Sequence, residues 1–257
     1  ATWNFPLHFI DFETSAVALP FYEGMRPYEQ IAFQFSHHRV DLNEDGSYRI
    51  THAGQFINTE KGHFPNFDFI RALKNELDKD KGTIFRYSNH ENTILREIHK
   101  QLENSHEEDK EELQAFIESI THYKDGKDEF VGKRDMVDLA DVVLKYYFHP
   151  MMKGSYSIKV VLPSVLNSSD FIKDKYSRFI YGTEEMPSMN LTKPKAWIEY
   201  EEDGKTVKNP YKLLPPIANY LNNSEDSIEG LENDESIASG GAALAASVTA
   251  IYPLLGT

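Results

Sequence analysis

Two acidic side chains follow a short apolar run near the start of the sequence. The run 7–12 has the composition of a buried strand, and Asp11 and Glu13 are two residues apart at its end. Residues i and i+2 of a strand point to the same face, so the two carboxylates share one face, roughly 7 Å apart. Such a pair offers oxygen ligands to a hard divalent cation. The alternative is that both acids are solvated at a strand end.

A second group of polar residues occupies 87–91, where a predicted strand meets a predicted helix. Glu91 then lies in the first helical turn, where the helix dipole favours a carboxylate. Two interpretations remain open: an ordinary first-turn glutamate, or a third metal-binding carboxylate beside Asp11 and Glu13. Asn89, in the same segment, is a candidate contact to substrate.

Asp138 is an acidic residue within the apolar segment 136–139. A buried carboxylate requires a partner or a metal ion, which makes Asp138 a further candidate for a catalytic site. Capping the helix that follows would satisfy it equally well. The sequence leaves both interpretations open.

A basic segment follows Pro150. Lys153 and Lys159 are candidates for phosphate contacts, and Tyr156 is a candidate for stacking on a base. The same stretch also reads as the start of a helix. In that case Ser157 is its cap, with core positions at Ile158, Val161 and Leu162.

Several classes of chemistry are excluded by the residues present. The chain has no cysteine, which rules out a disulfide framework, a thiolate zinc site and a cysteine nucleophile. His37 and His38 are adjacent on a predicted strand, so they face opposite ways and do not chelate together. No signature of a serine hydrolase, a phosphate-binding loop or a dinucleotide site is present. The net charge of −14 argues against a dedicated nucleic-acid-binding surface, but metal-holding carboxylates contribute to that charge themselves.

The predicted elements form a mixed α/β sheet with helices on its faces. Three strands come first, at 7–12, 30–40 and 47–56, followed by a helix with Phe67, Ile70, Leu73 and Leu77 on one face. A fourth strand at 83–87 and two more helices follow, their apolar faces containing 94–102 and 113–120. The segment 136–139 is either a fifth strand or the entry to a helix reaching Tyr147. An acidic segment, 222–235, and a last helix, 238–252, complete the chain.

These residues resemble a known group of enzymes. Asp11-Phe12-Glu13-Thr14 looks like the first motif of the DEDD-type 3′–5′ exonucleases, and the element order is the one expected of a ribonuclease H-like fold. The second motif of that group has an acid at the start of the helix after strand four and a Leu four residues on, as Glu91 and Leu95 are here. The segments 9–14, 23–36, 149–163 and 240–243 are also similar to a bacterial domain of unknown function, number 2779.

The resemblance implies metal-dependent hydrolysis of DNA or RNA. Mg²⁺ or Mn²⁺ would be held by Asp11, Glu13 and Glu91. The exonucleases carry a last acid on their final helix, and here Ser239 and Gly240 stand near that place, so Asp138 is the candidate for a substitute. The departure also favours an alternative: an inactive nucleic-acid-binding or protein-interaction module on the same fold.

The organisation of the chain yields further expectations. We expect one ribonuclease H-like domain over 1–257, with 150–235 as a peripheral insertion or subdomain. The chain lacks an initiator Met and runs almost directly into a strand, which indicates a fragment of a longer protein with a further nuclease-like domain. No secretory signal or membrane-spanning stretch is present, and the expected location is the bacterial cytoplasm.

Overall fold

The computed structural model describes residues 3–20, 22, 24–58, 60, 62–186 and 193–213. The chain divides into two compact units, the first ending at Asp141 and the second beginning at Val142. Each unit is described by itself. The predicted segments 222–235 and 238–252 lie outside the described residues.

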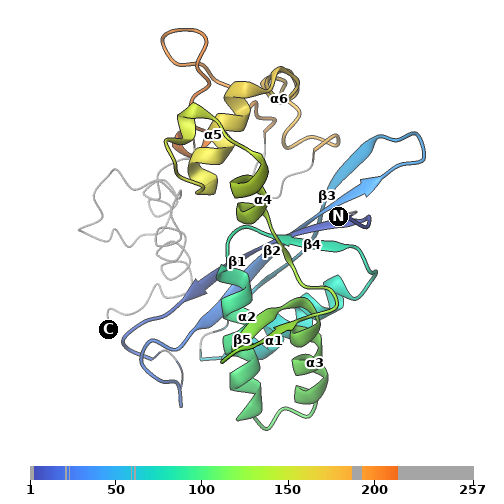
Figure 1. The fold of residues 1–257 in the computed structure, drawn as a ribbon, viewed down its shortest axis with the longest axis vertical. Coiled ribbons are helices and arrows are strands. Elements are labelled where there is room, and N and C mark those ends of the chain that lie inside the picture. The colour runs from blue at the N-terminus through green and yellow to red at the C-terminus, as the bar shows by residue number, and fades with distance from the viewer. Residues whose placement is uncertain are drawn as a thin grey trace. The chain divides into compact units, whose positions relative to one another are not determined.

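A mixed five-stranded sheet forms the centre of the first unit, as the sequence predicts (Figure 1). Strands β1 (Leu7–Ser15), β2 (Ile31–Leu42) and β3 (Tyr48–Ile57) make an antiparallel meander. Strand β4 (Thr83–Arg86) runs parallel to β1, and β7 (Val137–Asp138) runs parallel to β4. The order across the sheet is therefore β3-β2-β1-β4-β7.

Three helices pack against one face of this sheet. They are α1 (Asn66–Leu77), α2 (His90–Glu103) and α3 (Lys110–Ile120). Their apolar residues recur at helical spacing, so each helix buries one side. The ring of Phe12 in β1 meets that of Phe69 in α1 edge-on at 4.8 Å. The buried core joins sheet and helices through residues that include Ile10, Phe35, Leu73, Leu95 and Ile117.

One feature of the first unit departs from the sequence prediction, and another agrees with both of the interpretations that the sequence left open. A hairpin of β5 (His122–Asp125) and β6 (Asp128–Val131) was not predicted. Its strands are short and mostly polar, and all of β6 is exposed, so they carry no hydrophobic alternation. The segment 136–139 fulfils both of its interpretations. The two-residue strand β7 leads directly into α4 (Leu139–Tyr146), which spans the boundary between the units.

The second unit consists of short helices around a small core. It contains the 3₁₀ helices η1 (Pro150–Met152) and η2 (Pro210–Leu213), and the α-helices α5 (Ile158–Ser168) and α6 (Asp170–Ser177). Ser157 caps α5 as predicted, since its hydroxyl accepts the N–H of Lys159 at 3.4 Å. Val161 is buried, but the core prediction is wrong for Ile158 and Leu162, which are 41% and 36% exposed. The described core, built around Leu166, Ile198 and Val207, covers only one side of α5.

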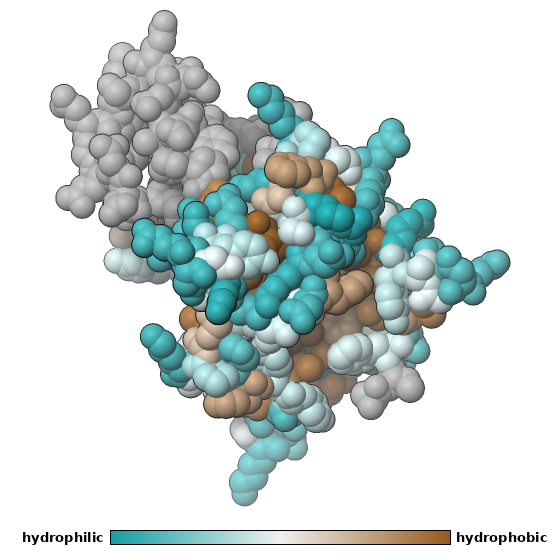
Figure 2. All heavy atoms as spheres, turned by 90° about the horizontal axis from the view of Figure 1, so that it is seen from above, coloured by the Kyte–Doolittle hydropathy of each residue, from teal (hydrophilic) through white to brown (hydrophobic). Residues whose placement is uncertain are grey.

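The described surface is mainly hydrophilic on the face seen in Figure 2, with hydrophobic side chains visible between the polar ones. Large exposed apolar side chains of the second unit include Tyr146, Phe148, Phe171 and Phe179. Single exposed apolar residues are ordinary on protein surfaces. No helix among the described residues has the length and apolar character that crossing a bilayer requires.

Candidate active site at the end of strand β1

The two acids of β1 lie on the face of the sheet opposite to its helices. Ile10 and Phe12 are buried in the core, and alternation along a strand therefore directs Asp11 and Glu13 to the other face. The register between β1 and β2 shifts immediately after Glu13, at Thr14. Such β-bulges re-aim side chains and are common next to active sites. The strand thus presents both carboxyl groups at a place where its regular pairing is interrupted.

The start of α2 meets the end of β1. Thr14 Oγ1 and His90 Nε2 are 3.1 Å apart, which links the strand to the first residue of the helix. His90 and Asp11 attract each other electrostatically. Glu91 is the next residue of α2, and the negative charge of Asp11 raises the pKa of its carboxyl group. The structure therefore brings together the three carboxylates that the sequence singled out.

The charges of the β1 acids are unfavourable in this environment. Burial raises the pKa of Glu13 to about 7, and the nearby Asp11 carboxylate acts in the same direction. Asp11 is exposed at the surface, but the surrounding protein still desolvates its carboxyl group and raises its pKa, and His90 and the backbone N–H of Phe12 oppose the rise. Perturbed carboxyl pKa values of this kind concentrate at functional sites.

Glu91 is a buried residue. Its side chain is 3% exposed, and its Oε2 atom has no hydrogen-bond partner among the described residues. Burial raises the pKa of Glu91 to about 7, helped by the charges of Asp11 and Asp138 and opposed by its own backbone N–H and by Arg86. An ordinary first-turn glutamate would be solvated, so burial and the unpartnered oxygen argue against that interpretation.

Asp138 is close enough to influence Glu91, but its own oxygens are already engaged. Oδ1 accepts the N–H groups of Ser88 and Ala140 at 2.9 and 2.8 Å, and Oδ2 accepts from Arg86 Nη1 at 2.7 Å. Arg86, which also donates to the Ser88 carbonyl, is 3% exposed. The bond to Ala140 is of the helix-capping type. The geometry therefore gives Asp138 the capping role and one half of a buried ion pair.

The carboxylates suit a divalent cation in donor chemistry. Within the described ranges, no three His, Asp or Glu side chains are placed to hold a metal ion together. However, Mg²⁺ in proteins is usually held by one or two carboxylates, with water and substrate phosphates completing its shell. The unpartnered Glu91 Oε2 and the repulsion between Asp11 and Glu13 are features that a cation would relieve. Asp11, Glu13 and Glu91 therefore suit a metal in donor chemistry, although their described positions do not form a three-ligand site.

The predicted substrate contacts fall in two places. Asn89 directly precedes α2 and donates from Nδ2 to Thr93 Oγ1 at 3.3 Å. Lys153, Tyr156 and Lys159 belong to the second unit, where all three are exposed along the connection from η1 into α5. Only Asn89 therefore lies beside the carboxylates within one unit.

Three residues near the site, Thr14, His90 and Arg86, were not identified as candidates from the sequence. Thr14 and His90 stand next to residues that were singled out, so their positions in the motifs were a usable signal. Arg86 offered no such signal. Its partner Asp138 is 52 residues away, and the contact exists because β4 and β7 are neighbours in the sheet.

The model of one protein family matches residues 8–157, and its description is a domain of unknown function (DUF2779). No curated protein and no solved structure matches the chain. The matched range contains every carboxylate of the site.

Proposed function

Because this chain belongs to the DUF2779 family, whose description assigns no function, we propose an activity from the site itself. The proposed activity is metal-dependent hydrolysis of phosphodiester bonds in DNA or RNA, acting as a 3′–5′ exonuclease. The observation that carries the proposal is the grouping of Asp11, Glu13 and Glu91. They come from two elements that are far apart in sequence, and burial raises the pKa of Glu13 and of Glu91 to about 7.

The residues have separate roles in this proposal. The charge of Asp11 acts on both Glu13 and Glu91, and these three residues would hold Mg²⁺ or Mn²⁺. Such ions activate water and stabilise the leaving oxygen in phosphodiester hydrolysis. Asn89 would orient the substrate, and Asp138 would position the start of α4 and the backbone before α2 through Ala140 and Ser88.

The fold supports a relationship to ribonuclease H-like nucleases. A meander of three strands, followed along the chain by a helix, a fourth strand, two helices and another strand, is the element order that the resemblance predicts. In this arrangement β1 carries the first acids, and the helix after β4 carries the next. The last acid of the exonuclease pattern would fall near Ser239 and Gly240, which lie outside the described residues.

The proposal is tested by cleavage and by metal binding together. The full chain is incubated with end-labelled single-stranded DNA and RNA, with Mg²⁺ or Mn²⁺, beside Asp11→Asn. Asp128→Asn, on the exposed strand β6, is the matched control. We expect cleavage by the native chain and the control, and a loss of at least 100-fold in Asp11→Asn, as is usual when a catalytic electrostatic group is removed. Mn²⁺ binding, measured by electron paramagnetic resonance, should weaken in the same variant. An equal cleavage rate in Asp11→Asn refutes the proposal.

The alternative is a module that binds nucleic acid without cleaving it. The described residues contain no preformed three-ligand metal site, which is the observation that favours it. It predicts oligonucleotide binding that survives Asp11→Asn and no turnover with either metal ion. Metal-stimulated cleavage excludes it.

A further inference from the structure

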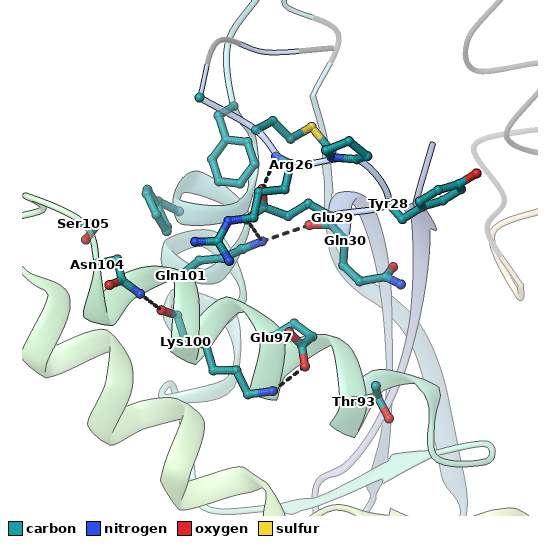
Figure 3. A pocket seen from close by; sticks show the side chains of 15 residues that line it. Arg26, Tyr28, Glu29, Gln30, Thr93, Glu97, Lys100, Gln101, Asn104 and Ser105 are labelled. Atoms are coloured by element: carbon teal, nitrogen blue, oxygen red, sulfur yellow. Dashed lines mark hydrogen bonds and ion pairs between the residues drawn. The ribbon is translucent and has the colours of Figure 1, made fainter. Parts of the chain in front are cut away.

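A hollow of about 830 Å³ lies in the first unit between the segment 24–30 and one face of α2 (Figure 3). Phe67 of α1 and Phe64, two residues before that helix, line it on one side, and the face of α2 from Thr93 to Gln101 lines the other. The same helix begins with His90 and Glu91 of the candidate active site. At a rise of 1.5 Å per residue, α2 places Gln101 of the hollow roughly 15 Å along the helix axis from Glu91 of the candidate active site.

The segment that borders the hollow is held by a chain of hydrogen bonds. Glu29 accepts the N–H of Arg26 at 2.8 Å and the amide of Gln101 at 3.2 Å. Gln101 in turn accepts from Asn66 at 2.6 Å, and the buried Asn66 accepts the N–H of Ala32 at 2.8 Å. The rim is therefore preorganised, which lowers the entropic cost of binding a ligand.

Arg26 supplies an available positive charge at the rim. The Glu29 carboxylate accepts a hydrogen bond from the backbone N–H of Arg26. The guanidinium group of Arg26 forms no ion pair among the described residues. Figure 3 shows the Arg26 side chain reaching from the segment toward α2, near Gln101. Lys100, the other cation of the hollow, pairs with Glu97 at 2.7 Å. A guanidinium without a carboxylate partner is well suited to bind a phosphate group through two parallel hydrogen bonds.

Aromatic side chains border the same hollow. Tyr28 is 68% exposed and adopts a left-handed backbone conformation, with φ of 62°. Its N–H is held by the Val17 carbonyl at 2.8 Å. A non-glycine residue held in this region is strained, and such strain is concentrated at ligand-binding sites. Phe64 and Phe67 meet edge-on at 5.5 Å and provide a second aromatic surface.

We propose that this hollow binds single-stranded nucleic acid, with a backbone phosphate on Arg26 and bases against Tyr28 and Phe64. The inference rests on the proposed function. In that function the end of a nucleic-acid strand is cleaved at Asp11 and Glu91, and the hollow would bind the adjoining nucleotides of the same strand. Cationic groups interleaved with aromatic rings are the usual features of single-strand binding. Arg26 has no ion pair among the described residues and lies beside aromatic side chains, and this combination favours an anionic strand over a neutral ligand.

The test measures binding separately from cleavage. A fluorescein-labelled single-stranded 12-mer is titrated with the full chain carrying Asp11→Asn, and its anisotropy is followed at several salt concentrations. Arg26→Gln should weaken binding about tenfold and reduce the slope of log K against log salt by about 0.7, the value for one phosphate contact on a single strand. Tyr28→Asn removes the ring but keeps a residue that tolerates positive φ, and should weaken binding about fivefold or more.

Arg49→Gln is the matched control, since Arg49 is 66% exposed on β3 of the same unit and does not line the hollow. Native affinity in both Arg26→Gln and Tyr28→Asn overturns the inference, as does the absence of oligonucleotide binding at low salt. Binding that depends on Arg26 without any cleavage by the native chain supports the hollow and overturns the nuclease. Cleavage by the native chain at a rate that neither Arg26→Gln nor Tyr28→Asn changes supports the nuclease and overturns the hollow as a binding site.

Discussion

His37 is a buried histidine on β2 that should make the first unit less stable in mild acid. Its ring is 1% exposed, and its Nε2 lies 2.9 Å from Nδ1 of His8. Its Nδ1 lies 3.6 Å from Glu76 of α1. Burial lowers the pKa of His37 from 6.5 to about 4. The neighbouring His8 and Lys79 act in the same direction, and Glu76 opposes them. The folded protein therefore holds this imidazole in its neutral form.

The sign and size of the effect follow from the two pKa values. Between pH 6.5 and 4, the unfolded chain binds a proton at His37 that the folded chain does not, so the free energy of unfolding falls as the pH falls. With these two values, the loss at pH 5 relative to pH 7.5 is about 2 kcal/mol. The carboxyl groups of Glu13 and Glu91 shift in the opposite direction, so a variant is needed to isolate His37.

The comparison uses His37→Gln, whose amide nitrogen is able to donate to His8 in place of the imidazole. Urea unfolding is followed at pH 7.5 and pH 5 through the fluorescence of Trp3, which packs against Phe85 at 4.9 Å in the first unit. A Trp197→Phe background removes the signal from the second unit.

The native chain should lose about 2 kcal/mol more than His37→Gln between the two pH values. His106→Gln removes an exposed histidine between α2 and α3 and should behave as the native chain does. An equal loss of stability in the native chain and in His37→Gln would refute the argument, because the buried imidazole would then contribute nothing to the pH dependence.

Two further predictions concern the carboxylates beside α2. Asp138→Ala should lower the free energy of unfolding by roughly 3–5 kcal/mol, because it leaves the buried Arg86 without its partner. Asp141→Ala, on the exposed side of α4, is its control in urea unfolding, and similar losses in both would contradict the role of the ion pair. Glu91→Gln should raise the free energy of unfolding by about 1 kcal/mol without divalent ions, because it neutralises a buried charge whose Oε2 has no described partner. The same variant should weaken Mn²⁺ binding, and a loss of stability would show that the charge is compensated.

The sequence predicts the elements of the first unit wherever one apolar pattern is long enough to fix the period. Helix α1 buries Ile70, Leu73 and Leu77 at the predicted spacing, and the three strands of the meander fall in the predicted segments. The strands of the β5–β6 hairpin have four residues each and β7 has two, so none of them is long enough to show an apolar alternation in the sequence. Such short strands depend on the neighbours that they pair with, and the sequence does not show those neighbours.

The candidate site divides in the same way between local and distant information. Asp11 and Glu13 share a face because of strand geometry, and Glu91 follows from its place at the start of a helix. Neither rule shows whether Glu91 is buried, nor that Asp138 pairs with Arg86 across two strands. His37 and His38 face opposite ways as predicted, with His37 buried and His38 exposed. The bond from His37 to His8 depends on the pairing of β1 with β2.

Glu91 and Asp138 provide an internal comparison that bears on function. Both carboxylates are largely buried and close enough to influence each other. Asp138 is compensated by Arg86 and two backbone N–H groups, which is how folded proteins normally accommodate a buried charge. Glu91 keeps one oxygen without a described partner and faces the negative charges of Asp11 and Asp138. A structural role would explain the first arrangement but not the second. The proposed cation at Asp11, Glu13 and Glu91 would explain why the fold retains an arrangement that costs it stability.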